Sequence, residues 1–258
     1  MSIKKLYFIC LLFILPFIGE SQPLGSYQFK DGLWYLATES ISPIPPIPGY
    51  LQGTNYSSPT PATPSTTLIT HFNANATAGD TIIVQAGAYT GGNGATVSIT
   101  DSLGNTYTPA LPLQSWKSNN SWHRMFYATN ITGGSCWVTS TWTASITYPS
   151  MYILEYTNIA SYNPVDQYSA NSGTTAAANE WIRNTAITTV QSYEIAIGYA
   201  DDNTGPLAVG PNFGTPYSLK LTQMEDLVIT NIGQVQGSFT NVASSDPYTV
   251  IVVTFKHK

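Results

Sequence analysis

Charged residues and cysteines are scarce in this chain. Only 9% of its 258 residues are charged, and the net charge is −5. A nucleic-acid-binding protein needs a basic surface to meet the phosphates, so we expect no nucleic-acid partner. Cys10 and Cys136 are the only cysteines, and Cys10 lies in the apolar N-terminal run. A chain processed after that run has no intrachain disulfide and depends on a large apolar core. With 43% hydrophobic and 12% aromatic residues, it can build one.

The opening residues, MSIKKLYFICLLFILPFIGESQ, have the features of an export signal. Lys4 and Lys5 precede an apolar run that ends at Ile18, and small residues follow it. We expect a signal peptide over residues 1–21, with cleavage after Ser21. The run is shorter than the roughly 20 residues of a membrane-spanning helix, so we expect no transmembrane segment in the processed chain. Retention as an N-terminal anchor is the alternative. The expected location is secreted or at the extracellular cell surface.

Two short segments precede the main domain. Residues 22–42 contain Lys30-Asp31-Gly32 between apolar flanks, which predicts a short β segment or a hairpin. Residues 43–67 contain seven prolines and many Ser and Thr residues. Proline withdraws backbone donors and favours extended conformers, so this stretch is expected to be a semi-rigid linker.

Residues 68–258 have the pattern of strands separated by turns. Stretches such as DTIIVQAGAY, SMYILEYTNI and YTVIVVTF are rich in β-branched and aromatic residues and are bounded by turn formers. ITDSLGNTYTP, residues 99–109, predicts a hairpin turn capped by Asp101. TTAAANEWIR, residues 174–183, is the one candidate for a helical turn or two. The expected fold class is all-β, a two-sheet antiparallel β-sandwich of jelly-roll or Ig-like topology.

A set of short motifs occurs in a fixed order along this domain. They are AGDTIIV, VSITDSLGNTYT, YATNITGG, MYILEYTNIASYNPVDQ, SYEIAIGYA and DPYTVIVVTFK. Together they resemble a widespread β-sandwich domain of bacterial secreted and surface proteins and of phage structural proteins. The resemblance covers about 190 residues. It implies a sandwich fold in an extracellular or virion-surface setting and assigns no catalytic residues.

Catalytic patterns are weak in this chain. No Gly-x-Ser-x-Gly elbow is present, and the three histidines do not have metal-ligand spacing. Glu155 and Glu194 lie on strands and are the candidate pair for a glycoside hydrolase, which needs two carboxylates across a sugar cleft. Strand alternation places Glu155 on the face of Met151 and Ile153, opposite Tyr152. A sandwich also carries such acids on solvated faces and edges.

Two further side-chain groups have weak functional interpretations. Asp201 and Asp202 begin an acidic loop and are better calcium candidates than the ITDSLGNTYTP turn, which offers a single carboxylate. A solvated loop is the simpler interpretation of both residues. We otherwise expect no cofactor. Cys136 alternates with Val138 and Trp142, which predicts a buried, inert thiol. A disulfide to another subunit is its alternative.

The tryptophans indicate a binding surface. In SCWVTSTWTAS, if Val138 and Trp142 face the core, Trp137 and three threonines (Thr139, Thr141 and Thr143) face outward. An exposed indole beside hydroxyls suits sugar stacking. Trp116 and Trp122 flank KSNNS and are candidates for a loop platform of the same kind. Ordinary packing of sandwich edges is the alternative for all three tryptophans.

These observations favour a secreted, non-enzymatic structural or adhesive protein that works by self-association or surface binding. Its expected partners are other copies of itself or surface glycans. Self-association is expected through residues 22–42, added as a strand to the sheet of a neighbouring copy. Folding back onto its own domain is the alternative for this arm. The alternative function is a carbohydrate-binding, lectin-like module or a glycoside hydrolase that uses the strand carboxylates.

Overall fold

The structure is a computed structural model of the chain. It describes residues 27–30, 33–36, 43–57, 64–89, 94–112, 114–116, 121–202, 208–214, 217, 222–241 and 243–258. The chain divides into two compact units, Met1–Ile44 and Pro45–Lys258. Within the described residues all regular secondary structure is β, so the all-β fold class is confirmed. The same residues contain no helix long and apolar enough to cross a membrane.

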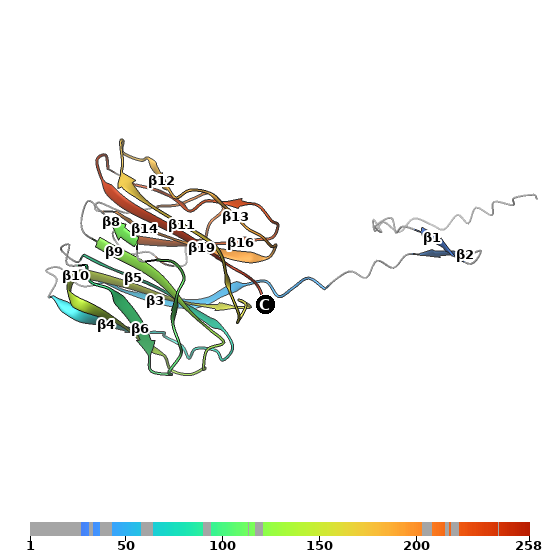
Figure 1. Cartoon of the computed structure of the whole chain (residues 1–258), viewed down its shortest axis with the longest axis horizontal. Helices are drawn as coiled ribbons and strands as arrows, with labels where there is room; N and C mark the ends of the chain where they lie inside the picture. The colour runs from blue at the N-terminus through green and yellow to red at the C-terminus, as the bar shows by residue number, and fades with distance from the viewer. Residues whose placement is uncertain are drawn as a thin grey trace, which may run out of the picture. The chain divides into compact units, whose positions relative to one another are not determined.

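Among its described residues, the first unit contains one strand pair. β1 (Tyr27–Lys30) is antiparallel to β2 (Leu33–Leu36), with Lys30 opposite Leu33 (Figure 1). This pairing is the one that a hairpin around Asp31-Gly32 requires. The turn itself and the expected signal peptide, residues 1–21, lie outside the described residues.

In the second unit a single long strand, β10 (Trp137–Thr157), takes part in two sheets. Its first half pairs with β4 (Ser65–His71) on one side and β6 (Val97–Asp101) on the other, forming sheet I. Its second half lies between β3 (Gly49–Ser57) and β5 (Thr81–Tyr89) in sheet II. The pairing register with β5 shifts beside Tyr148, whose φ is 49°. From the sequence alone this segment contains two strand candidates, CWVTSTWTASI and SMYILEYTNI, with Pro149 between them.

Sheet II continues from β5 to β9 (Ser121–Thr129), and β9 also pairs with β7 (Thr108–Pro109) and β8 (Gln114–Trp116). Sheet III has the order β11-β19-β14-β16. Its strands are β11 (Val165–Thr174), β19 (Pro247–Phe255), β14 (Glu194–Asp202) and β16 (Thr222–Ile229). Sheet IV is β12 (Trp181–Arg183), β18 (Ser238–Thr240) and β15 (Ala208–Val209). Beside it lies the small pair β13 (Ile187–Thr188) and β17 (Gln234–Val235).

The sheets stack in four successive layers, I to IV, with apolar cores between them (Figure 1). Alternate residues of β5 contribute to the cores on both sides of sheet II. Ile82 and Val84 pack towards sheet I, whereas Ile83 packs towards sheet III. Sheets II and III are covered on both faces, so β5, β14 and β19 are buried almost throughout. Such strands read as continuous apolar runs rather than alternating ones. The antiparallel sandwich expected from sequence is therefore present, with more than two layers.

The structure corrects the prediction of a linker over residues 43–67. This stretch contains all of β3 and the first residues of β4. β3 pairs with β10 over eight registered positions. Proline removes a backbone donor only where it stands. The stretch between Pro48 and Pro59 contains no proline, so it keeps all its donors and completes the edge of sheet II.

The prediction of a hairpin turn at ITDSLGNTYTP is correct for the turn and wrong for the pairing of its flanking strands. Asp101 does organise a turn: Oδ1 accepts hydrogen bonds from the Leu103 and Asn105 backbone N–H groups at 2.9 and 3.0 Å, and Oδ2 accepts one from the Tyr107 hydroxyl at 2.9 Å. Gly104 supplies a φ of 78°. The flanking strands, however, do not pair with each other. β6 belongs to sheet I and β7 to sheet II, so the turn crosses between layers. TTAAANEWIR is also corrected, because it forms bends and turns that lead into β12 rather than a helical turn.

Candidate functional site

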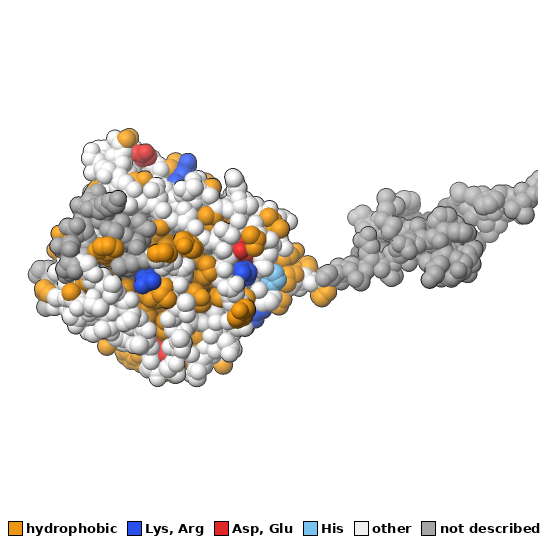
Figure 2. All heavy atoms as spheres, in the orientation of Figure 1, with side chains coloured by type: hydrophobic (Ala, Val, Ile, Leu, Met, Phe, Trp, Pro, Cys, Tyr) orange, Lys and Arg blue, Asp and Glu red, His pale blue; other side chains and the backbone are white. Residues whose placement is uncertain are grey.

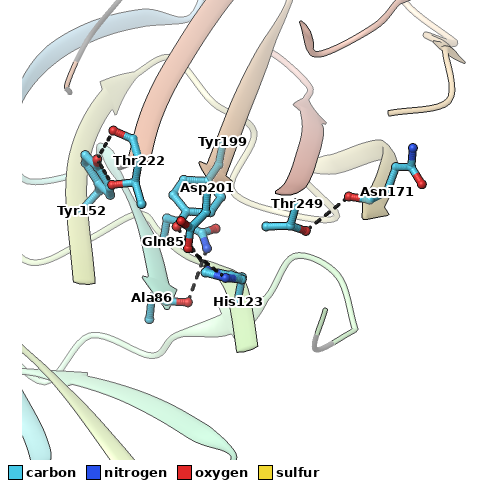
Figure 3. A network of polar contacts seen from close by, with 9 residues as sticks. All are labelled: Gln85, Ala86, His123, Tyr152, Asn171, Tyr199, Asp201, Thr222 and Thr249. Carbon is cyan, nitrogen blue, oxygen red and sulfur yellow. Dashed lines mark hydrogen bonds and ion pairs between the residues drawn. The ribbon is translucent and has the colours of Figure 1, made fainter. Parts of the chain in front are cut away.

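Polar side chains gather between sheets II and III (Figure 3). We call these the interior polar cluster: Gln85 of β5, His123 of β9, Tyr152 of β10, Tyr199 and Asp201 of β14, and Thr222 of β16. The Asp201 carboxylate lies 3.1 Å from Nε2 of His123, and the Tyr199 hydroxyl lies 3.2 Å from Nδ1. The Tyr152 hydroxyl donates to the Thr222 carbonyl at 2.9 Å. Each of these contacts joins one sheet to the other.

Burial keeps the His123–Asp201 pair neutral. The imidazole is 1% exposed, and burial lowers the pKa of His123 to about 3. Burial also raises the pKa of Asp201 well above its usual value, with the nearby Asp202 and Asp246 charges acting in the same direction. A neutral pair inside a low-dielectric layer forms hydrogen bonds without the cost of buried charge. The cluster therefore holds sheets II and III in register, and its imidazole is not accessible to a substrate.

The two calcium candidates point away from each other. Asp201 points to His123, and Asp202, the next residue of the strand, is 1% exposed on the other face of sheet III. Within the described residues no group of three or more His, Cys, Asp or Glu side chains could hold a metal ion. The rest of the acidic loop, residues 203–207, lies outside the described residues.

The two glycosidase candidates are also separated. Glu155 faces sheet I, where Oε1 accepts a hydrogen bond from Thr77 N at 2.6 Å and Oε2 accepts one from Gln52. Glu194 shares a face of β14 with Ala196, which packs towards the sheet IV side. Burial, assisted by Asp166, raises the pKa of Glu194 to about 7. Two sheet thicknesses therefore lie between carboxylates that would need to be roughly 5–9.5 Å apart, and stacked sheets are about 10 Å apart. The structure does not bring this pair together.

Trp137 faces outward, as the strand alternation predicted. It is 49% exposed, whereas Val138, Ser140 and Trp142 are buried. We call the outward side of sheet I the Trp137 face. Its side chains come from three strands: Thr67, Ile69 and His71 of β4; Trp137, Thr139, Thr141 and Thr143 of β10; and Ser98 and Thr100 of β6.

The pairing register turns these side chains into rows. Thr139 lies opposite Ile69 on one side and Thr100 on the other, and Thr141 lies between Thr67 and Ser98. Neighbouring positions are about 4.8 Å apart across strands and about 6.7 Å apart along a strand. The result is a regular array of hydroxyl and methyl groups, three strands wide.

An imidazole stands beside the indole at one end of this array. His71 lies opposite Trp137 in the ladder, and their ring centroids are 4.3 Å apart with the planes tilted by 44°. Sequence reasoning did not assign His71 or Ile69 to this surface. The only available signal was the alternation in TTLITH, because nothing in the sequence shows that β4 is the neighbour of β10.

The other two tryptophan candidates do not join this surface. Trp122 is partly buried and packs against the core between sheets I and II. Trp116 ends β8, but its side chain and residues 117–120 lie outside the described residues. Cys136 is buried as expected, and burial together with the Asp101 carboxylate raises the pKa of its thiol to about 12.

The surface of the second unit carries little charge. Figure 2 shows mainly uncharged and hydrophobic side chains on one face, with isolated charged groups. No family model, no curated protein and no solved structure matches the chain. The functional interpretation therefore rests on the side-chain geometry alone.

Proposed function

We propose that this protein is a secreted, non-enzymatic adhesive β-sandwich protein that binds a surface, and that its Trp137 face binds glycans. The half-exposed indole of Trp137 beside an ordered array of hydroxyls carries this proposal. A tryptophan ring offers a large apolar plane to the C–H face of a sugar. Thr and Ser hydroxyls can both donate and accept, which suits the hydroxyl groups of a glycan.

The shape of the face indicates what kind of glycan it fits. Its rows of side chains extend along and across three strands of sheet I, so the face is a sheet surface. A sheet surface of this kind contacts a polymer along its length, over several sugar units. We therefore expect binding to extended polysaccharide chains and weaker binding to monosaccharides, because each sugar unit adds contacts along the face.

A glycan array followed by calorimetry tests the proposal. Trp137→Ala should weaken binding to the best neutral polysaccharide by about tenfold or more, because truncating an interface tryptophan commonly costs at least 1–2 kcal/mol. Trp137→Phe, which keeps a smaller ring, should have an intermediate effect. Tyr162→Ala is the matched control, because Tyr162 is also an exposed aromatic residue but lies in the loop between β10 and β11, outside sheet I. Binding by no glycan, or equal binding by Trp137→Ala, would remove the proposal.

Self-association is a second candidate, and the composition of β3 favours it. β3 is an edge strand of sheet II, and none of its nine residues, GYLQGTNYS, is charged. Natural edge strands are usually protected by charge, proline or a cover. Residues 22–42 of another copy are the proposed partner of this edge. Deleting residues 22–42 should abolish assemblies seen by size-exclusion chromatography or electron microscopy, and unchanged assembly would reject this candidate.

A further inference from the structure

Sheet IV carries an aromatic–cation pair on its outer side. Trp181 is 38% exposed, and the guanidinium carbon of Arg183 lies 5.4 Å from the centroid of its ring. Ile182, between them in β12, is 1% exposed and packs into the core on the inner side. Since successive strand residues point to opposite faces, Trp181 and Arg183 share the outward face.

The charge of Arg183 is not neutralised within the described part of the chain. No Asp or Glu of the described residues forms an ion pair with it. Glu180, the nearest acid in sequence, is exposed and lies just before β12. Its Oε2 accepts hydrogen bonds from the Ala176 and Ala177 N–H groups at 2.7 and 3.1 Å. A cation in a chain of net charge −5, with its acid neighbour held elsewhere, is available to an external anion.

The backbone that presents the pair is held from two sides. Asn171 of β11 donates a side-chain hydrogen bond to the Arg183 carbonyl at 2.9 Å. On the other side β12 pairs with β18, which places Trp181 opposite Thr240. The cation–π contact further restricts the guanidinium, so fewer rotamers are lost when a ligand binds.

We propose that Trp181 and Arg183 form a second saccharide-binding site, selective for sugars that carry a carboxylate. The indole offers a stacking plane to the sugar ring, and the guanidinium fork matches a carboxylate with two parallel hydrogen bonds. Thr240 adds a hydroxyl beside the indole. This site lies on the outermost layer opposite the Trp137 face, three interlayer spacings or about 30 Å away. It does not depend on the glycan proposal for the Trp137 face.

Titrating the full-length protein with polygalacturonate tests the proposal, with methyl-esterified polygalacturonate as the ligand control. Arg183→Gln removes the charge-assisted hydrogen bonds to the carboxylate, so it should weaken polygalacturonate binding by about tenfold or more. Trp181→Ala should weaken it to a similar extent. Arg183→Lys keeps the charge but loses the fork, and should fall between the wild type and Arg183→Gln.

Two matched controls separate this site from general effects. Arg124→Gln removes the same charge from a similar pair, Arg124 over Phe126 at 5.5 Å, and should leave polygalacturonate binding unchanged. Tyr162→Ala removes an exposed aromatic ring between β10 and β11, outside both proposed sites, and should also leave it unchanged. Circular dichroism of each variant verifies the fold.

Three results would overturn the proposal. One is no binding of polygalacturonate by the wild type. Another is retained binding by both folded variants, Arg183→Gln and Trp181→Ala. The last is equal binding of the esterified polymer or of polyglutamate, because the first lacks the carboxylates and the second lacks the sugar ring.

Discussion

The interior polar cluster and the Trp137 face are built from the same types of residue. Each contains an imidazole beside an aromatic ring, His123 with Tyr199 at 5.4 Å and His71 with Trp137 at 4.3 Å, and each contains at least one threonine hydroxyl. In the interior these groups contact partners on the opposite sheet, whereas on the outer face they contact residues of their own sheet. The comparison shows that residue type does not identify a binding site here. Burial and the direction of the contacts do.

The largest expected effect comes from truncating the interior cluster. Tyr199 is fully buried between sheets II and III, so Tyr199→Ala removes an aromatic ring and leaves a cavity beside His123. We expect a loss of about 3–5 kcal/mol in the free energy of unfolding, measured by urea denaturation. Trp137→Ala is the comparison and should lose less than about 1 kcal/mol. Similar losses in the two variants would contradict the distinction.

The pH dependence of stability sharpens the comparison next. Glu225 of β16 is fully buried, and burial raises the pKa of its carboxyl to about 8. The pKa of Glu225 in the folded protein is above its unfolded value of about 4.5. Its contribution to the free energy of unfolding is therefore fully present below pH 4.5 and is lost as pH rises towards 8.

The free energy of unfolding of the wild type should therefore decline by roughly 2–4 kcal/mol between pH 5 and pH 9, because each unit of pKa shift corresponds to about 1.4 kcal/mol. Glu225→Gln should remove this decline. Urea denaturation of both proteins at the two pH values measures it. His123 acts in the opposite direction: its folded pKa is lowered to about 3, so its contribution is lost as pH falls from 6.5 towards 3. An unchanged slope in Glu225→Gln would contradict the assignment of a protonated interior carboxyl.

A smaller effect is expected at Asp101, which is partly exposed and serves the turn between layers I and II. Asp101→Ala leaves the N–H groups of Leu103 and Asn105 without their acceptor. The expected loss is about 1–2 kcal/mol by thermal or urea unfolding. Asp101→Asn keeps one acceptor oxygen and should lose less. Glycan binding at low temperature should survive both changes, since Asp101 does not belong to the Trp137 face.

The smallest expected effect concerns the hydroxyl rows of the outer face. Thr139→Val and Thr141→Val keep the β-branched shape and remove one hydroxyl each. Stability should change by less than about 0.5 kcal/mol, whereas affinity for the polysaccharide should fall by roughly two- to fivefold per hydroxyl. Calorimetry on the folded variants measures it. Unaltered affinity in the double variant would mean that the indole acts without the array.

Alternation within a strand was readable from the sequence. SCWVTSTWTAS placed Val138 and Trp142 inward and Trp137 outward, and the exposures agree. The β-branched runs and their turn residues also predicted the all-β class. These features depend on neighbours in the chain, and a strand has a strict period of two.

Pairing between distant segments was not readable. The neighbour of Trp137 is His71, 66 positions earlier in the chain, and the contact exists only because β4 lies beside β10. For the same reason Glu155 and Glu194 looked like partners in the sequence, although two sheets separate them. The proline-rich composition of residues 43–67 hid β3, because an average over that stretch does not show where donors remain.

The double membership of β10 has a mechanical consequence. Trp137 and Tyr152 belong to one continuous backbone, with the first in sheet I and the second in the core between sheets II and III. If a polymer binds at the Trp137 face as we propose, a pull on it is carried along covalent bonds into the middle of the molecule, where β10 is hydrogen-bonded on both sides by β3 and β5. The hydrogen bonds of sheet II therefore share such a load with those of sheet I.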